Sequence, residues 1–265
     1  MTESYLQRFG GIGRLYGAEA LPRLHAAHVA VIGVGGVGSW VVEALARSGI
    51  GALTLVDMDD VCITNTNRQL PALAQTVGHM KVDVLARRVA EINPECQVQA
   101  LPEFLLESNA DRLLGSGFSC VVDAVDSTNI KALIIAKAGD LGFPVVVSGS
   151  AGGRRDPTQI KATDLGLAGP DPLLQQVRRR LRDVHGFAKS PGGRPMHWGV
   201  PCVFSSEKAV FPQSDGTCST EREAGAETGL RLDCSAGFGA STVVTGTFGF
   251  ALAAEVLRIL TTAQN

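Results

Sequence analysis

Short apolar runs alternate with amphipathic stretches along the first half of the chain. The pattern predicts strands over residues 28–34 and 53–56, with a helix over residues 39–47 between them. Apolar residues at three- and four-residue spacings predict another helix over residues 72–92, which Asn93-Pro94 ends. The same alternation continues with strands over 97–101, 118–122 and 143–148, and with helices over 110–114 and 129–138. Because strands that alternate with helices form parallel βαβ units, the expected fold class is α/β, a Rossmann-like nucleotide-binding sheet flanked by helices.

The second half of the chain contains no convincing linker, so we expect one domain over residues 1–265. A nucleotide-binding half, 1–150, precedes a substrate-facing half, 151–265, which ends in an extension on the same sheet. The stretch Val243–Leu260 is mostly apolar, but it contains Glu255 and Arg258 and falls short of the roughly 20 apolar residues of a membrane span. We therefore expect a buried helix there and no membrane span.

Composition narrows the class of protein and its compartment. With 265 residues, 45% of them hydrophobic and 19% charged, the chain can build a sizeable core. The net charge of −2 does not point to a polyanion partner, although local basic patches remain possible. No basic stretch followed by an apolar run begins the chain, so no signal peptide is expected. The six cysteines form no CxxC pair, which argues against structural zinc and favours free thiols in the cytoplasm.

A glycine loop follows the first predicted strand. Its glycines are Gly33, Gly35, Gly36 and Gly38, and the helix over residues 39–47 begins directly after them. Glycines allow the backbone to approach a polyphosphate closely, and the helix start offers free N–H groups. Asp57 ends the second strand about 20 residues further on, where a carboxylate can bind ribose hydroxyls. The loop therefore indicates a nucleotide site, the alternative being a turn that only packs helix on strand.

Polar and cationic residues after Asp57 narrow the kind of nucleotide. Asn67 and the nearby cations Arg68 and Lys81 suit a triphosphate that is being cleaved, and a dinucleotide-binding dehydrogenase has no use for them. Residues 53–69 resemble the ubiquitin-activating-type adenylating enzymes, the ThiF/MoeB superfamily, so that 1–265 would be a single ThiF-type adenylating domain. The resemblance implies ATP and Mg²⁺ as cofactors. It implies Arg68, Lys81 and Asp126 as catalytic residues, and Gly33, Gly35, Gly36, Gly38, Asp57, Asp59, Asn65 and Gln69 as nucleotide-binding residues.

Two aspartates at the end of the strand over residues 118–122 are candidates for the metal site. Asp123 and Asp126 lie where ligands bind in open α/β sheets, and either carboxylate could hold magnesium that bridges ATP phosphates. Asp123 could equally be a helix cap or turn former. The family resemblance places the metal ligand at Asp126. Asn129 follows Asp126 by three residues, whereas in the superfamily an asparagine usually follows directly.

The later half indicates one branch of the superfamily. Its Asp156-Pro-Thr-Gln-Ile160, Pro212-Gln-Ser-Asp-Gly216 and Asp233-Cys234 through Gly239 are similar to the tRNA threonylcarbamoyladenosine dehydratases. In that branch ATP activates the free carboxylate of the modified adenosine, and a neighbouring nucleophile of the same modification closes a ring and expels AMP. No cysteine lies between Cys120 and Cys202, so we expect no enzyme thioester in the loop after residue 148. We expect Cys234 to pack and not to act as a nucleophile.

The resemblance also implies partners. These are tRNA, a second copy of the chain in a homodimer and, as a further candidate, a protein of sulfur metabolism. An N-terminal arginine, Arg8 or Arg14, would enter the partner subunit's site, the alternative being a solvated surface cation. The run Arg178–Arg182 and the basic loop 186–199, with Lys189, Arg194, His197 and Trp198, suit phosphate contacts or a solvated face equally.

Two other enzyme functions and a non-catalytic role stay open. One is an adenylating enzyme for a small sulfur-carrier protein, and another is an NAD-dependent oxidoreductase on the same loop. The third is a scaffold that keeps the fold without catalysis.

Overall fold

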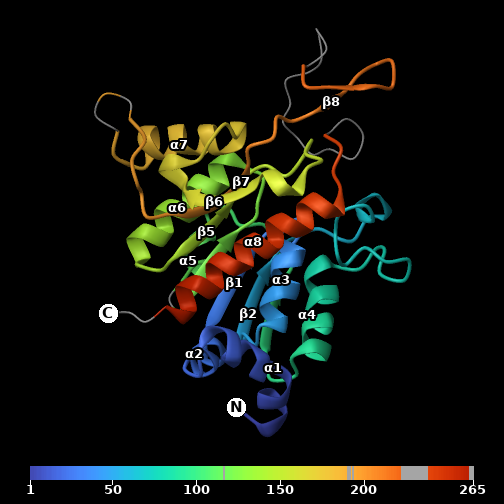
Figure 1. Cartoon of the computed structure of the whole chain (residues 1–265), viewed down its shortest axis with the longest axis vertical. Helices are drawn as coiled ribbons and strands as arrows, with labels where there is room; N and C mark the ends of the chain where they lie inside the picture. Colours follow the sequence, from blue (N-terminus) through green and yellow to red (C-terminus); the bar gives the residue numbers. More distant parts are fainter. Residues whose placement is uncertain (116, 190–191, 193, 222–237, 263–265) are drawn as a thin grey trace.

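The computed structural model describes residues 1–115, 117–189, 192, 194–221 and 238–262. A seven-stranded sheet forms its centre, in the order β3-β2-β1-β4-β5-β7-β6 (Figure 1). All neighbouring strands run parallel except β6, which pairs antiparallel with β7 at one edge. The strands are β1 (His28–Ile32), β2 (Ala52–Val56), β3 (Gln97–Leu101), β4 (Cys120–Asp123), β5 (Val145–Ser148), β6 (Ile160–Asp164) and β7 (Pro201–Ser205). The predicted α/β class is confirmed.

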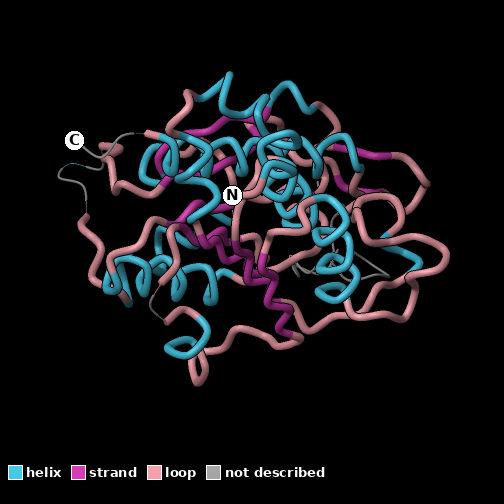
Figure 2. Tube along the Cα trace, turned by 90° about the horizontal axis from the view of Figure 1, so that it is seen from below, coloured by secondary structure: helices cyan, strands magenta, loops and turns pink. Residues whose placement is uncertain are grey.

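Helices cover both faces of this sheet, as the view from below shows (Figure 2). They are α1 (Glu3–Tyr16), α2 (Ala20–Ala26), α3 (Gly38–Arg47), α4 (Lys81–Ile92), α5 (Ala110–Leu113), α6 (Thr128–Leu141), α7 (Pro172–Val184) and α8 (Thr242–Thr261). Short 3-10 turns are η1 (Ile63–Asn65), η2 (Pro157–Gln159) and η3 (Leu165–Leu167), and a small separate hairpin joins β8 (Phe211–Pro212) to β9 (Cys218–Ser219).

The apolar strands create two cores, because successive side chains of a strand point to opposite faces. Val29 and Val31 of β1 belong to the core under α3, α4 and α8. Ala30 and Ile32 belong to the core under α5, α6 and α7. A strand that is buried on both faces is a near-continuous apolar run, which explains the Val-Ala-Val-Ile sequence.

The helix predicted over residues 72–92 is wrong in its first part. Helix α4 begins at Lys81, and residues 72–80 form turns. The loop folds back on itself there, with Val61 N–H donating to His79 O and Gly78 N–H donating to Val61 O, both at 2.8 Å. Gly78 has a φ of +83°, which a helix does not accept. The helical spacing of apolar residues therefore extends into a loop that is mostly exposed to solvent.

The polar lead-in over residues 3–25 folds as α1 and α2. Tyr5 and Phe9 are buried in it with Leu21, and the Tyr5 hydroxyl donates to Gly49 O at 2.5 Å. Gly49 lies directly after α3, before β2 begins, so α1 covers the amino-terminal edge of the sheet (Figure 1).

The C-terminal helix is a core element, as the sequence predicts. By length and composition α8 could cross a membrane, but half of its apolar window is buried inside the protein. It packs beside α3 and against β5, β6 and β7, with Phe248 and Leu252 fully buried. Cys234 and most of the motif around it lie outside the described residues.

Candidate active site

A cavity of about 770 Å³ lies at the carboxyl ends of β1, β2, β4 and β5. Open α/β sheets bind their ligands at this edge. The structure brings ten of the predicted site residues to its wall: Gly33, Gly35, Gly36, Asp57, Asp59, Asn65, Arg68, Gln69, Lys81 and Asp126. Arg8 and Arg14 are exposed on α1, at the opposite edge of the sheet, and do not line it.

The glycine loop shows two different reasons for glycine. Gly33 has a φ of +83°, and a Cβ there would lie 3.1 Å from the Ala124 backbone. A Cβ on Gly38 would lie 1.9 Å from Gly33 O, so Gly38 lets the loop close onto α3 and does not itself line the cavity. A Cβ on Gly35 or Gly36 would have no neighbour closer than 3.5 Å, and both glycines line the cavity. The middle of the loop therefore exposes its backbone to the cavity.

Asp57 connects the end of β2 to the glycine loop. One carboxylate oxygen accepts from the Val34 N–H at 2.8 Å, and the other accepts from the Asp59 N–H at 2.9 Å. Burial raises the pKa of Asp57, and the two N–H groups and the Lys81 ammonium oppose this effect. The carboxylate therefore fixes the loop, and Asp57 also lines the cavity.

Lys81 carries a buried ammonium at the start of α4. It is 4% exposed, and its Nζ lies 2.8 Å from the Asp59 carboxylate, whose side chain is 54% exposed. Helix α4 and the bridge between Asp60 and Met80 hold this pair at the cavity wall. An incoming phosphate would find the cation already oriented.

Arg68 is held by contacts that the sequence did not indicate. Its Nη1 donates to Thr64 O at 2.8 Å, and its own carbonyl accepts from Trp40 Nε1 and Thr245 Oγ1 at 3.2 and 3.1 Å. Thr245 belongs to α8 and lies 177 residues away in sequence. No local pattern could have found this contact, because it depends on how α8 packs beside α3.

Asn65 and Gln69 occupy the turn between Asp59 and Lys81. The Asn65 side chain is buried and accepts from the Cys62 N–H at 3.1 Å, which closes η1. Gln69 is also buried, and its Oε1 has no hydrogen-bond partner in the described part of the chain. Asn65 therefore shapes the loop, whereas Gln69 places its amide Nε2 near Gly35 and keeps a buried Oε1 acceptor unused within the described residues.

The structure separates the two metal candidates. Asp123 is fully buried, and its carboxylate lies 3.0 Å from the equally buried Lys131 ammonium. Burial raises the pKa of Asp123, an effect that Lys131 only partly opposes. Asp126 is exposed on the cavity wall. Asp123 is therefore engaged in a buried ion pair, and of these two aspartates Asp126 is the one whose carboxylate is exposed at the cavity.

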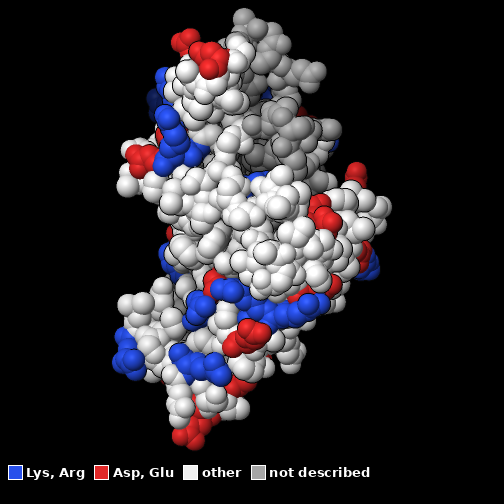
Figure 3. Space-filling view, turned by 90° about the vertical axis from the view of Figure 1, so that its right-hand side faces the viewer, with Lys and Arg blue, Asp and Glu red and all other residues white. Residues whose placement is uncertain are grey.

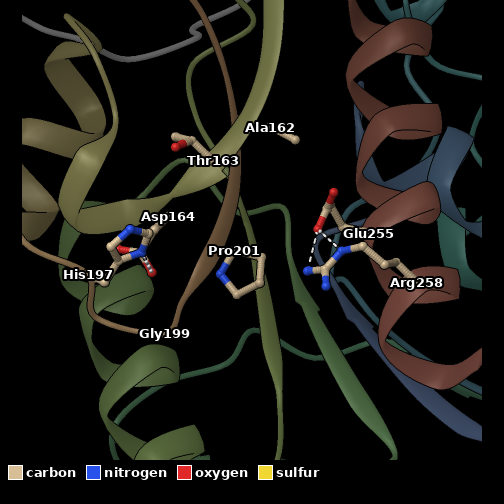
Figure 4. Close-up of a pocket in the computed structure, with 8 residues that line it drawn as sticks. All are labelled: Ala162, Thr163, Asp164, His197, Gly199, Pro201, Glu255 and Arg258. Carbon is tan, nitrogen blue, oxygen red and sulfur yellow. Dashed lines mark hydrogen bonds and ion pairs between the residues drawn. The ribbon is translucent and has the colours of Figure 1, made fainter. Parts of the chain in front are cut away.

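A second cavity, of about 450 Å³, lies between β6, β7 and α8. Figure 4 shows Asp164 and His197 on one side of it and Glu255 and Arg258, from α8, on the other. The Asp164 carboxylate accepts from three backbone N–H groups at 2.8 to 3.0 Å, and Glu255 pairs with Arg258 at 2.8 Å. These contacts hold the loop before β7 and the surface of α8, so the charged groups Asp164, Glu255 and Arg258 have a structural role there.

The basic run on α7 divides into two sets. Arg178 donates to Leu165 O at 3.3 Å, and Arg182 stacks over the Trp198 ring at 5.9 Å. Arg179 and Arg180 are exposed. Half of the run therefore has a packing role, and half faces solvent.

Comparison with known proteins places the chain in a family. It matches the ThiF family over residues 11–265 and belongs to it. It is similar to the tRNA threonylcarbamoyladenosine dehydratase of Escherichia coli (strain K12), with 49% identity over 97% of this chain and 95% of that protein. Within the ThiF family the chain therefore belongs to the tRNA threonylcarbamoyladenosine dehydratases.

Solved structures agree with this placement. The chain resembles that of the Escherichia coli tRNA N6-threonylcarbamoyladenosine dehydratase in complex with ATP, with a TM-score of 0.84, 44% identity, and coverage of 98% of this chain and 96% of that one. A complex of the same protein with AMP gives 46% identity, a TM-score of 0.84 and the same coverage.

Proposed function

We propose that this chain dehydrates threonylcarbamoyladenosine in tRNA by using ATP to adenylate its free carboxylate. The proposal depends on one observation. The glycine loop, Arg68, Lys81 and Asp126 all line the same cavity. Family membership supports the substrate, and the ATP and AMP complexes of the similar Escherichia coli protein support the nucleotide.

The chemistry needs two bond exchanges. A carboxylate oxygen of the substrate attacks the α-phosphorus of ATP, the bond to the β-phosphate oxygen breaks, and pyrophosphate leaves. A nucleophilic atom of the same modification then loses its proton and attacks the acyl carbon, and AMP leaves with the former carboxylate oxygen. The nucleoside has lost one water. Ring closure within one molecule proceeds at high effective molarity, so no enzyme thiol is required.

The residues of the cavity divide these tasks. Gly35 and Gly36 present the loop backbone to the phosphates, and Asp57 faces the ribose. Arg68 and Lys81 stabilise the negative charge that develops on the transferring phosphate and on pyrophosphate. Asn65 and Gln69 orient the loop and the nucleotide.

Magnesium is part of the proposal, and Asp126 is its protein ligand. Mg²⁺ is usually bound through one or two carboxylates together with substrate phosphates. Among the described residues no group of three His, Cys, Asp or Glu side chains could hold an ion alone. One exposed carboxylate beside a triphosphate loop fits this mode of binding, in which the bound ion neutralises phosphate charge.

Asp126→Asn should therefore remove magnesium-dependent activity, because a neutral amide is a poorer ligand for a hard cation. The measurement is AMP formation during a magnesium titration. Asp140→Asn is the matched control, since Asp140 is an exposed carboxylate near the far end of α6. An unchanged titration curve for Asp126→Asn would show that the metal has another ligand.

We propose that tRNA lies across α7. Pro172 and Gln176 of this helix line the cavity, and Arg179 and Arg180 continue outward from it. The face seen in Figure 3 carries positive and negative side chains intermixed in its lower part and a wide uncharged zone across its middle.

Replacing Arg179 and Arg180 together by Ala should weaken tRNA binding and flatten its dependence on salt. Each lost phosphate contact lowers the slope of log K against log salt by about 0.7 to 0.9. Fluorescence anisotropy over a salt series measures both quantities. Arg87→Ala is the control, because Arg87 is an exposed cation of α4, which lies at the other end of the sheet (Figure 1). Equal slopes for wild type and the double variant would remove α7 from the tRNA surface.

The family resemblance further supports a cytoplasmic homodimer. Helix α1 covers the edge of the sheet opposite to the cavity of its own chain, so Arg8 and Arg14 cannot serve that cavity. In a dimer one of them would enter the partner subunit's site. A protein of sulfur metabolism remains a further candidate partner.

The rival function is adenylation of a small sulfur-carrier protein. The two functions differ in which substrate makes ATP turnover start. We expect labelled AMP from α-labelled ATP only when tRNA that carries threonylcarbamoyladenosine is added. ATP–pyrophosphate exchange that depends on a carrier protein, and not on tRNA, would favour the rival.

A further inference from the structure

Arg154 is the third cation on the wall of the large cavity, and the adenylation chemistry above does not use it. It follows β5, in the segment that leads away from the carboxyl edge of the sheet. Only 3% of its surface is exposed. Its Nε and Nη1 atoms have no hydrogen-bond partner within the described residues. A buried guanidinium in this state is unusual, because buried polar groups are nearly always paired.

The carboxylates nearest to Arg154 are already engaged elsewhere. Asp171 accepts from the backbone N–H groups of Ser150 and Leu174, at 2.8 and 3.0 Å. Glu207 accepts from two backbone N–H groups at 2.9 and 3.0 Å. Neither carboxylate accepts a hydrogen bond from Nε or Nη1 of Arg154. Burial lowers the pKa of Arg154, and the nearby charges of Asp171 and Glu207 oppose this effect. Because an arginine stays protonated in proteins, the cavity wall carries a buried guanidinium whose Nε and Nη1 make no hydrogen bond within the described residues.

The backbone around Arg154 is rigidly placed. Gly153 has a φ of +70°, and a Cβ there would lie 2.8 Å from the Phe238 ring and 2.9 Å from Val210 O. Phe238 and Phe211 also line the cavity, with ring centroids 5.1 Å apart and planes at 46°. Arg154 therefore sits beside aromatic surface, on a segment that glycine allows to pack tightly.

A buried guanidinium that lacks hydrogen bonds destabilises the unbound protein, and an anionic ligand that supplied those hydrogen bonds would offset this cost. Two anions enter this cavity in the proposed reaction, the phosphates of ATP and the carboxylate of the nucleoside. Arg68, in the loop after β2, and Lys81, at the start of α4, line the cavity together with the phosphate-binding glycines. Arg154 comes instead from the segment after β5, together with the aromatic rings that suit an unstacked base.

We propose that Arg154 binds the free carboxylate of the substrate nucleoside, beside an aromatic surface formed by Phe211 and Phe238. The inference rests on the proposed function and names the residue that recognises the reacting group. A guanidinium can hold a carboxylate through two parallel hydrogen bonds, which fixes its orientation. Held in this way, the carboxylate can present an oxygen to the α-phosphorus, and the guanidinium stays close to the acyl oxygen during ring closure.

The test compares binding of two tRNAs that differ only in the threonylcarbamoyl group. Wild type should prefer the modified tRNA over the unmodified transcript. Arg154→Met should lose about 10- to 100-fold of that preference, the usual effect of removing hydrogen bonds to a charged group. Its affinity for ATP and for the unmodified transcript should stay that of wild type. Arg155→Met is the matched control, since Arg155 is the exposed neighbour, and it should keep the preference.

Thermal unfolding separates binding from a structural role. Arg154→Met should melt at or above the temperature of wild type without ligand, because it removes a buried charge whose Nε and Nη1 lack hydrogen bonds. Lower melting temperatures for both Arg154→Met and Arg154→Gln would overturn the proposal, as would a preference that Arg154→Met retains. Weaker ATP binding with the preference intact would assign Arg154 to the nucleotide phosphates. If wild type itself does not convert modified tRNA, the proposed function fails, and the assignment of Arg154 fails with it.

Discussion

Lys81→Ala and Arg68→Ala should each lower the rate of AMP formation by about 100-fold or more, the usual effect of removing a charge-stabilising donor from a reaction centre. Both cations line the cavity next to the glycine loop, and both are oriented before any nucleotide binds. The measurement is release of labelled AMP with saturating modified tRNA.

The same two variants should remain folded. Lys81 pairs with Asp59, which is exposed enough to be solvated when its partner is removed. Lys161→Ala is the control, because Lys161 is an exposed lysine of β6 that does not line the large cavity. If both cation variants turn over at nearly the wild-type rate, this cavity is not where ATP is cleaved.

Lys131→Met should destabilise the protein by about 3 to 5 kcal/mol, since it leaves the Asp123 carboxylate buried without its counter-ion. Urea denaturation measures the free energy of unfolding. Combining Lys131→Met with Asp123→Asn should recover much of the loss, because the buried charge has then gone. Lys137→Met on the same helix is the control, as Lys137 pairs with Asp111 near the surface.

This ion pair also bears on the active site. Asp123 ends β4, Lys131 lies in the first turns of α6, and the loop between them carries Asp126. A stability change of less than about 1 kcal/mol in Lys131→Met would be an ordinary surface effect and would contradict a buried pair that anchors this loop.

The sequence predicted the sheet and its nucleotide edge because the signals there are local. Continuous apolar runs identify strands that are buried on both faces, and β1, β2 and β5 lie close to their predicted positions. Residues that follow a strand end can also be assigned to the site from the sequence, because all parallel strands bring their carboxyl ends to one edge of the sheet. This is why the predicted residues from Gly33 to Asp126, apart from Gly38, meet in one cavity.

The rest could not be predicted because it depends on contacts between distant segments. Residues 72–80 carry helical spacing, but hydrogen bonds to Val61 and the conformation of Gly78 set a loop. Trp40 and Thr245 hold the carbonyl of Arg68 only because α3 and α8 pack side by side. No sequence pattern distinguishes Arg154, because its distinctive feature is that Nε and Nη1 are buried without a hydrogen-bond partner in the described residues.

The cavity also joins the two halves of the chain. The glycine loop, Lys81 and Asp126 come from the first half, and Arg154, Phe211 and Thr245 come from the second. The Thr242 hydroxyl donates to Asn67 O at 2.7 Å, so the start of α8 supports the loop that carries Arg68. Changes in the second half are therefore expected to affect nucleotide cleavage as well as tRNA recognition.

The central claim is that this cavity removes water from a tRNA nucleoside at the expense of ATP. The most direct test is mass spectrometry of the nucleosides after tRNA with threonylcarbamoyladenosine is incubated with the protein, ATP and magnesium. The account predicts a nucleoside lighter by one water, formed in step with AMP and absent when Lys81→Ala replaces wild type. Threonylcarbamoyladenosine that stays unchanged while the wild-type protein cleaves ATP would contradict it.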